Sequence, residues 1–412
     1  MKEVVCIAFS CPPILDAQSI LLAKMLRPLQ ARGYRLRIVG LDPGTCFGRT
    51  DDSLCDLLPS DAEVLRVAAS ERRLWYRAVN RWFPSLVRLP DRHLPALGRA
   101  VRAGKALHAA RPADLLFSWA QYHTCSLVAL RLKKALGLPW VAHFSDPWHG
   151  HPYLRPRAYA RWINARLEEA VIKAADAVVF VNEETRDWTM SRYPRSWNAK
   201  TRVIPHCFDP GLYPAKPARQ VGMVFRHIGQ FYGDRGPVSL LEAIARLRDS
   251  DAGLLEDVRF EFVGRVEEDH MSAMRKTGVD KWVTVRAGVG YRDSLREMTG
   301  ADVLLLVEAP AAMNLFLPSK LIDYLGAGRP ILALTPARGP AARLLAGTGD
   351  RVVSPDDVVG IAEALRQAIQ DCRRGSPARF GRSTNSTSAY HCNTTTRDLA
   401  AVFEEISRAE RS

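Results

Sequence analysis

The chain has 412 residues, which is longer than a domain with a single hydrophobic core usually is. Two domains of roughly 150–200 residues each are therefore expected. A hydrophobic share of 47% and a charged share of 25% are typical of a soluble globular protein, and no run approaches the roughly 18–20 apolar residues of a membrane-spanning helix. The net charge of +14 is unevenly distributed, and 8 scattered cysteines without a C-x-x-C pair favour reduced thiols in a cytosolic protein.

The first half of the chain alternates short apolar stretches with helical patterns. Because such alternation is typical of parallel sheets covered by helices, it predicts an α/β unit. Strands are expected at residues 4–9, 35–39, 115–118, 140–144, 177–181 and 202–204. Helices are expected at residues 17–32, 97–110, 124–136, 158–174 and 183–192. Residues 42–95 are expected to be irregular, apart from one basic helix.

Much of the positive charge lies in residues 66–111, which hold eleven Lys and Arg residues against Glu71 and Asp91. A helical repeat here places Trp75, Val79, Trp82 and Leu86 on one face and Arg73, Arg77 and Arg81 on another. A basic amphipathic helix with tryptophans favours contact with an anionic membrane surface. The alternative is a helix that packs its aromatic side chains on the domain core. No nucleic-acid-binding motif accompanies the charge, so no nucleic acid is expected as a partner.

A cluster of polar residues follows the predicted strand at residues 140–144. It contains His143, Asp146, His149 and His151. The spacing matches no helical zinc motif, so no metal is expected. Asp146 is predicted to lie at the mouth of a cleft, where a carboxylate can position an acceptor or transfer a proton. A purely structural Asp-Pro turn is the alternative.

The second half repeats the α/β pattern after a proline-rich stretch, residues 205–217, which is expected to link two domains. Strands are expected at residues 223–228, 259–263, 283–286, 303–307, 331–334 and 352–353. Helices are expected at residues 238–249, 267–276, 292–299, 319–325, 341–346 and 355–371. A polar stretch, residues 373–393, and a final helix at 396–408 complete the chain. Two doubly wound units imply a cleft between them, with ligands beyond the carboxyl ends of the strands.

Two loops of the second unit follow strands and precede helices. The first contains Gly229, Gln230, Tyr232 and Arg235, and its arginine is placed for a bidentate grip on phosphate. The second contains Val289 and Tyr291, and it could pass close to a planar base. The loop after the first strand of the chain, residues 10–13, has no G-x-G-x-x-G pattern, so a nicotinamide-dependent enzyme is not expected.

Residues 314–330 contain the most informative pattern in the chain. A short amphipathic helix is expected to begin near Pro318 and to end at a glycine-rich turn. Its start offers the Ser319 amide and hydroxyl, a positive helix end and the Lys320 ammonium, which together suit phosphate. Asp323 lies one turn further on and could accept the hydroxyls of a sugar. These features favour a nucleotide or nucleotide-sugar site, and the alternative is an ordinary amphipathic helix.

With these residues in place, the chain resembles a GT-B-fold glycosyltransferase, close to the large retaining group that uses nucleotide-sugar donors. The resemblance covers most of residues 1–370. It is strongest at residues 180–182, 203–206, 229–236 and 318–330. Residues 138–148 also resemble relatives in bacterial surface-polysaccharide synthesis.

The resemblance implies that the first unit binds the acceptor and the second binds the donor. Arg235 matches the cation of the family's G-R-x-x-x-x-K-G motif, and with Lys320 it would hold the diphosphate. Asp323 takes the place of the second Glu of the family's E-x(7)-E motif, which is expected to bind the ribose hydroxyls.

Two positions depart from the family pattern. The family's arginine is Gln230 here, which removes one phosphate cation, and the first Glu of the acidic pair falls on Leu315. The contact to the transferred sugar is therefore expected from Asn314 or Glu308.

The sequence thus predicts two doubly wound Rossmann-like α/β domains facing a cleft. Their expected ranges are 1–205 for acceptor binding and 206–380 for donor binding, followed by a tail and helix at 381–412. The expected activity is transfer of a sugar from a nucleotide-sugar donor to a lipid-linked or polysaccharide acceptor. Retention of configuration is implied by the resemblance alone.

Catalytic roles are predicted for Asp146, Lys320 and Arg235, with no cofactor beyond the donor substrate. One alternative is a nucleotide-sugar epimerase of the same fold. Another is a non-catalytic nucleotide-sugar binder or membrane-associated scaffold. The expected location is the cytoplasm, with peripheral attachment to the inner face of the membrane through residues 66–111.

Overall fold

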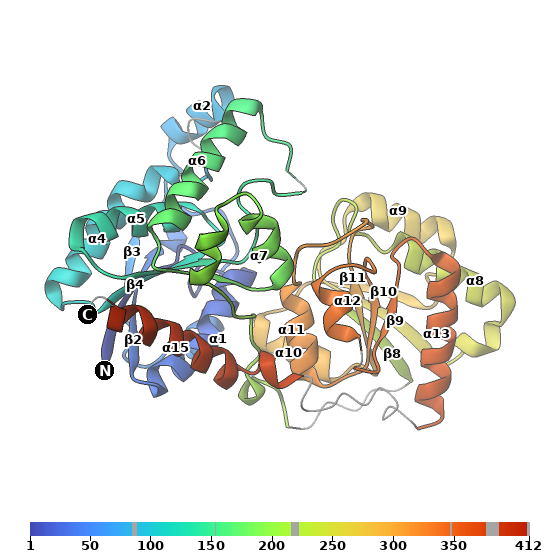
Figure 1. The fold of residues 1–412 in the computed structure, drawn as a ribbon. Coiled ribbons are helices and arrows are strands. Elements are labelled where there is room, and N and C mark those ends of the chain that lie inside the picture. Colours follow the sequence, from blue (N-terminus) through green and yellow to red (C-terminus); the bar gives the residue numbers. More distant parts are fainter. Residues whose placement is uncertain (85–88, 153, 216–221, 347, 376–386, 410–412) are drawn as a thin grey trace. The chain divides into compact units, whose positions relative to one another are not determined.

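The structure, a computed structural model of residues 1–412, divides into two compact units (Figure 1). It describes every residue except 85–88, 153, 216–221, 347, 376–386 and 410–412. Unit 1 comprises Met1–Cys207 and Cys392–Ser412, and unit 2 comprises Phe208–His391. Each unit is a parallel sheet with helices on both faces, which confirms the predicted pair of Rossmann-like α/β folds.

Unit 1 is built on a seven-stranded parallel sheet with the strand order β3-β2-β1-β4-β5-β6-β7. The strands are β1 (Lys2–Ile7), β2 (Tyr34–Leu41), β3 (Val64–Val67), β4 (Leu115–Ala120), β5 (Trp140–Phe144), β6 (Ala177–Phe180) and β7 (Thr201–Val203). Strand β1, inside the sheet, pairs Val4 with Leu36 of β2 and with Leu115 of β4. These apolar runs are buried because helices cover both faces, as in parallel sheets generally.

The helices of unit 1 form two hydrophobic layers. They are α1 (Ala17–Ala31), α2 (Leu74–Trp82), α4 (Leu97–Ala110), α5 (Thr124–Leu136), α6 (Ala158–Ala174), α7 (Glu183–Met190) and α15 (Cys392–Ala409). Side chains of α4, α5 and α6 join one layer, and side chains of α1 and α15 join the other. In the second layer the rings of Tyr34 and Phe403 meet edge to face at 5.3 Å, so the last helix is part of the unit 1 core.

The expectation that residues 42–95 are irregular outside one helix is wrong. Strand β3 pairs with β2 in register Ile38 to Val64, and two 3-10 helices, Pro43–Thr45 and Asp52–Leu57, precede it. The strand escaped prediction because it is a four-residue edge strand that contains Arg66 and is only partly buried.

The basic helix of this region is α2, and most of its side chains face solvent. Trp75 and Trp82 are 47% and 72% exposed, whereas Tyr76 is the one buried side chain that the structure describes in this helix. The two tryptophans therefore do not pack on the domain core. Leu86, predicted on the same face, lies outside the described residues.

Unit 2 has a six-stranded parallel sheet with the order β10-β9-β8-β11-β12-β13. The strands are β8 (Met223–Ile228), β9 (Val258–Val263), β10 (Val283–Arg286), β11 (Val303–Val307), β12 (Ile331–Leu334) and β13 (Arg351–Val353). The helices are α8 (Val238–Ser250), α9 (Glu268–Thr277), α10 (Tyr291–Thr299), α11 (Ser319–Ala327), α12 (Pro340–Leu345) and α13 (Val358–Arg373). The strand order reverses between the neighbours β8 and β11, which makes their carboxyl ends a topological switch point.

Candidate ligand site in unit 2

The switch point of unit 2 brings together polar side chains from distant parts of the chain. His227 and Gly229 lie at the end of β8, Glu308 directly follows β11, and Lys320 lies in the first turn of α11. Crevices at such points are where open α/β sheets bind ligands. The predicted residues of the 229–237 loop and of α11 therefore lie in one place.

The Lys320 ammonium lies directly over the backbone of the β8 loop. Its Nζ is 3.2 Å from His227 Nε2, and a Cβ added to Gly229 would come within 2.6 Å of it. His227 is buried, and its Nδ1 is 2.9 Å from the Leu305 carbonyl oxygen. Because a carbonyl can only accept, Nδ1 must carry the proton, which leaves Nε2 as the acceptor for Lys320.

Burial shifts the charge states of both groups. Desolvation, together with the charges of Lys320 and Arg235, holds the pKa of His227 well below its usual range, so this ring is neutral. Burial and the Arg235 charge lower the pKa of Lys320 to about 7, and the nearby Glu308 carboxylate opposes the shift. An anion placed here would favour the charged form of Lys320.

Glu308 is a fixed acceptor at the centre of the site. Asn314 Nδ2 donates to its Oε1 at 2.7 Å, and Thr335 Oγ1 donates to its Oε2 at 2.5 Å. Arg235 Nη2 lies 3.8 Å from Oε1, and the guanidinium also stacks over the Tyr232 ring, with 5.6 Å to the ring centroid. Burial raises the pKa of Glu308, while the hydrogen bond from Thr335 and the charge of Arg235 act against that rise. The carboxylate thus restrains both Arg235 and Asn314.

Asp323 is oriented by a neighbouring helix. Tyr291, the first residue of α10, donates its hydroxyl to Asp323 Oδ1 at 3.1 Å, and Tyr213 donates to the Asp323 carbonyl at 2.9 Å. Asp323 is 7% exposed, so little of its carboxylate is open to solvent. Tyr291, predicted to lie near a planar base, therefore also positions the predicted hydroxyl acceptor.

The remaining predicted residues of unit 2 surround these groups. Pro318 immediately precedes α11 and Ser319 begins it, and both are partly buried. In their strand-to-helix loops, Gln230 is exposed and Val289 is partly buried. Leu315, where the family pattern has an acid, is 3% exposed and belongs to the buried apolar residues.

Sequence reasoning missed His227 and Thr335 as parts of the site. His227 lies inside an apolar strand pattern, and Thr335 lies just past β12 in a stretch without a motif. Both become visible only when the sheet order is known. The sequence alone could have marked each as a candidate, because both are polar residues at the carboxyl end of a predicted strand.

In unit 1, the predicted Asp146 follows β5 and is partly buried. Burial raises its pKa to about 6, a value that suits proton transfer near neutral pH. The nearby histidines diverge: His143 is buried and stacks on Trp119 at 4.0 Å, whereas the His149 amide donates to Glu168 at 2.7 Å. Within the described residues, no group of three or more His, Cys, Asp or Glu side chains could hold a metal ion.

Comparison with known protein families gives two adjacent matches. Residues 19–212 match the model of Glycosyltransferase Family 4, and residues 223–371 match that of Glycosyl transferases group 1. Together the two matches span most of the chain. No curated protein sequence matches it.

Solved structures share the fold over the whole chain at low sequence identity. HepE from Anabaena, solved with UDP, has a TM-score of 0.68 at 16% identity and covers 98% of this chain and 100% of its own. Sucrose-phosphate synthase from Thermosynechococcus elongatus has a TM-score of 0.69 at 16% identity, with coverages of 99% and 100%. WaaG, a glycosyltransferase involved in lipopolysaccharide biosynthesis, has a TM-score of 0.59 at 17% identity, with 98% of each chain covered. The family matches, one on each α/β unit, identify the chain as a member of the GT-B-fold glycosyltransferases.

Proposed function

We propose that the protein transfers a sugar from a nucleotide-sugar donor to a lipid-linked or polysaccharide acceptor, with retention of configuration. The observation that carries the proposal is the pairing of Lys320 and Arg235 around Glu308 at the switch point of unit 2. Two cations and a helix start there match the charge of a diphosphate. Support also comes from HepE, a structural neighbour solved with UDP.

The proposed chemistry is electrostatic. When the glycosyl bond breaks with oxocarbenium character, negative charge grows on the departing diphosphate. Lys320 and Arg235 would stabilise that charge in a partly buried site, where preorganised cations act strongly. Asp323 would accept the ribose hydroxyls, and Asn314 or Glu308 would take over the sugar contact that Leu315 cannot make. Asp146 of unit 1 would position the acceptor hydroxyl or take its proton.

The experiment that tests the proposal begins with a panel of nucleotide sugars and their effect on the melting temperature, because a ligand of the folded state must raise it. The stabilising donor is then incubated with and without membrane extract, and the products are identified. We expect a sugar transfer that requires the extract. A sugar changed by the protein alone would instead indicate an epimerase, and binding without turnover would indicate a non-catalytic binder.

The proposal includes peripheral attachment to an anionic membrane surface through residues 66–111. The exposed tryptophans of α2 support it, since a basic helix with outward aromatic side chains suits the lipid interface. Among the described helices, none is both long and apolar enough to cross a bilayer. Co-sedimentation with anionic liposomes tests this attachment, and an Arg73/Arg77/Arg81 charge-reversal variant should bind less.

Donor-product affinity should depend on pH through Lys320. Because its pKa in the free protein is about 7 and a diphosphate favours the ammonium, UDP should bind more weakly as the pH rises above 7. The loss should approach about tenfold per pH unit until the pKa of the complex is reached. Calorimetry in two buffers of different ionisation enthalpy should show proton uptake on binding. Lys320→Arg should bind without this slope, and an equal slope in both proteins would assign it to another group.

The hydroxyl contact of Asp323 should be visible in nucleotide selectivity. Asp323→Asn should weaken UDP binding about tenfold, the order expected for a lost hydrogen bond to a charged group. It should weaken 2′-deoxy-UDP much less if the 2′-hydroxyl is the partner. Tyr291→Phe keeps the carboxylate and serves as the matched control, with a smaller loss. Equal losses for UDP and its deoxy analogue in the asparagine variant would rule out this contact.

A further inference from the structure

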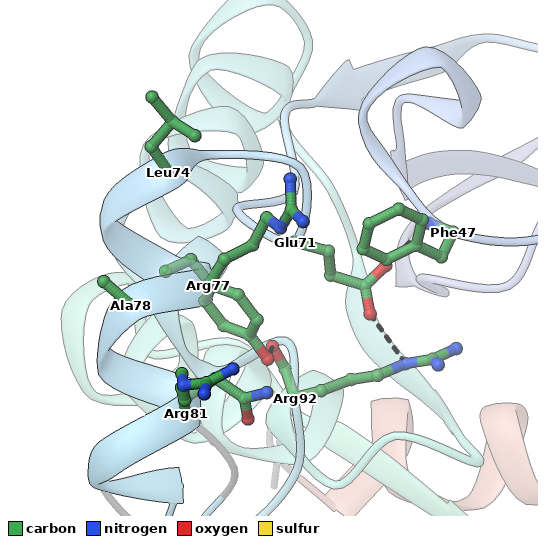
Figure 2. A pocket seen from close by; sticks show the side chains of 9 residues that line it. Phe47, Glu71, Leu74, Arg77, Ala78, Arg81 and Arg92 are labelled. Atoms are coloured by element: carbon green, nitrogen blue, oxygen red, sulfur yellow. Dashed lines mark hydrogen bonds and ion pairs between the residues drawn. The ribbon is translucent and has the colours of Figure 1, made fainter.

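Unit 1 contains a pocket of about 600 Å³ between α2 and the loops beside it (Figure 2). The pocket is lined by Phe47, Glu71, Leu74, Tyr76, Arg77, Ala78, Asn80, Arg81 and Arg92. Figure 2 shows Arg77 and Arg81 on α2 at one side, and Phe47 and Arg92 at the other. The site proposed for the donor lies in unit 2, so this pocket has no role yet.

The charge of the pocket is strongly positive. Three arginines line it, and among its described lining residues Glu71 is the only acid. The Glu71 carboxylate is already neutralised, because Arg92 Nε lies 2.9 Å from one oxygen and the Phe47 amide donates to the other at 2.8 Å. Within the described residues, Glu71 pairs with Arg92, and no ion pair joins a carboxylate to Arg77 or Arg81. The pocket therefore holds two guanidinium groups available to an anion.

The surroundings of the pocket add to this positive field. Burial lowers the pKa of Arg99, and the charges of Arg73 and Arg102 lower it further. Such mutual repulsion means that the cations here outnumber their counter-charges, and a bound anion would relieve it.

Further contacts hold the pocket in shape. Tyr76, the buried residue of α2, donates its hydroxyl to the Arg92 carbonyl oxygen at 3.1 Å, which ties the helix to the loop opposite. Arg72 donates to the Cys46 carbonyl at 2.9 Å and lies over the Phe47 ring. These contacts fix the backbone that carries the arginines of the pocket.

Large apolar side chains lie next to these cations. Leu74 lines the pocket and is 81% exposed, and Trp82 and Phe83 at the other end of α2 are 72% and 64% exposed. A ligand that suits this combination carries a phosphate together with a hydrocarbon chain. Phosphate matches guanidinium in a bidentate way, and the chain would cover the exposed apolar side chains.

We propose that this pocket binds the phosphate-bearing head group of a membrane lipid. The inference rests on the membrane attachment in the proposed function. It deepens that proposal, since it replaces a general attraction between the basic helix and an anionic membrane with a specific head-group site. Bidentate contacts from Arg77 and Arg81 select a phosphomonoester, which offers more free oxygens than a phosphodiester does.

Flotation with two kinds of phosphatidylcholine vesicle tests the proposal. One kind contains phosphatidic acid and the other phosphatidylglycerol, in amounts that give both vesicles the same surface potential. The protein should bind the phosphatidic acid vesicles about tenfold more tightly, and an Arg77→Lys/Arg81→Lys variant should lose this preference while it keeps general binding. Equal binding to both vesicles by the unaltered protein, or an unchanged preference in the lysine variant, would overturn the head-group site.

An Arg131→Lys/Arg166→Lys variant is the matched control, because both residues are exposed on other helices of unit 1 and neither lines the pocket. It should keep the lipid preference. Glycerol 3-phosphate should displace the protein only at concentrations far above that of the lipid. Displacement at equal concentrations would assign the pocket to a soluble phosphate ester and overturn the lipid assignment. The UDP-induced melting shift, measured on every variant, reports the donor site separately.

Discussion

Replacing Lys320 with alanine is expected to lower the affinity for UDP by at least about 100-fold and to reduce turnover by a similar or larger factor. The reason is that Lys320 provides a cation over the Gly229 backbone, and Arg235, which is restrained by Glu308, cannot move in to replace it. Calorimetry with UDP and initial rates with the stabilising donor measure the two effects.

The same substitution should leave the fold intact. The lowered pKa of Lys320 means that burying its ammonium costs free energy in the folded state, so its removal is not expected to lower the melting temperature. Lys320→Arg should retain part of the affinity, and Lys276→Ala, at an exposed position of α9, should retain all of it. Undiminished UDP binding by the alanine variant would refute the assigned role.

Gly229→Ala is expected to impair both stability and donor binding. Gly229 has a φ of +135°, which an L side chain rarely adopts, so the change should cost about 1–3 kcal/mol of unfolding free energy. Its new methyl group would also meet Lys320 Nζ at 2.6 Å and push the ammonium from its place. UDP affinity should therefore fall at least about tenfold. Denaturant titration measures the loss of stability, and calorimetry with UDP measures the loss of affinity.

A second glycine of the same loop serves as a control that distinguishes backbone strain from a steric clash with Lys320. Gly233 has a φ of +52°, and nothing lies within 4 Å of an added Cβ. Gly233→Ala should lose about 1 kcal/mol of stability and keep most of its UDP affinity. Similar affinities in the two alanine variants would show that the contact between Gly229 and Lys320 does not matter for binding.

Most strands of both units could be predicted because they are apolar runs bounded by turn residues, as at 303–307 and 331–334, whereas the short edge strand β3 could not. The glycine-rich loop around Arg235 and the helix start at Lys320 could also be predicted, since a strand-to-helix loop and a helix start are local features of the sequence. What could not be read was the environment of these cations. His227 and Lys320 are 93 positions apart, and Glu308 and Thr335 are 27 apart, so their contacts depend on strand order.

The same limit applies to the basic segment. Its helix was predictable from periodicity, but periodicity does not say which face of an amphipathic helix is covered. The structure shows that Tyr76 is buried and that Trp75 and Trp82 are not. The arginine-lined pocket depends on Phe47 and Glu71 as well, which precede α2 and belong to a region whose edge strand and 3-10 helices the sequence did not reveal.

The place of α15 has a consequence for the order in which the chain can fold. Unit 2 is continuous in sequence, whereas unit 1 is interrupted and regains Leu399, Val402 and Phe403 only from the last helix. During synthesis domains commonly fold as they emerge, with the N-terminal one first. Here that order is reversed: unit 2 can complete its core while unit 1 still exposes the surface that α15 will cover. The core of the N-terminal unit is thus completed only after all of unit 2 has been synthesised.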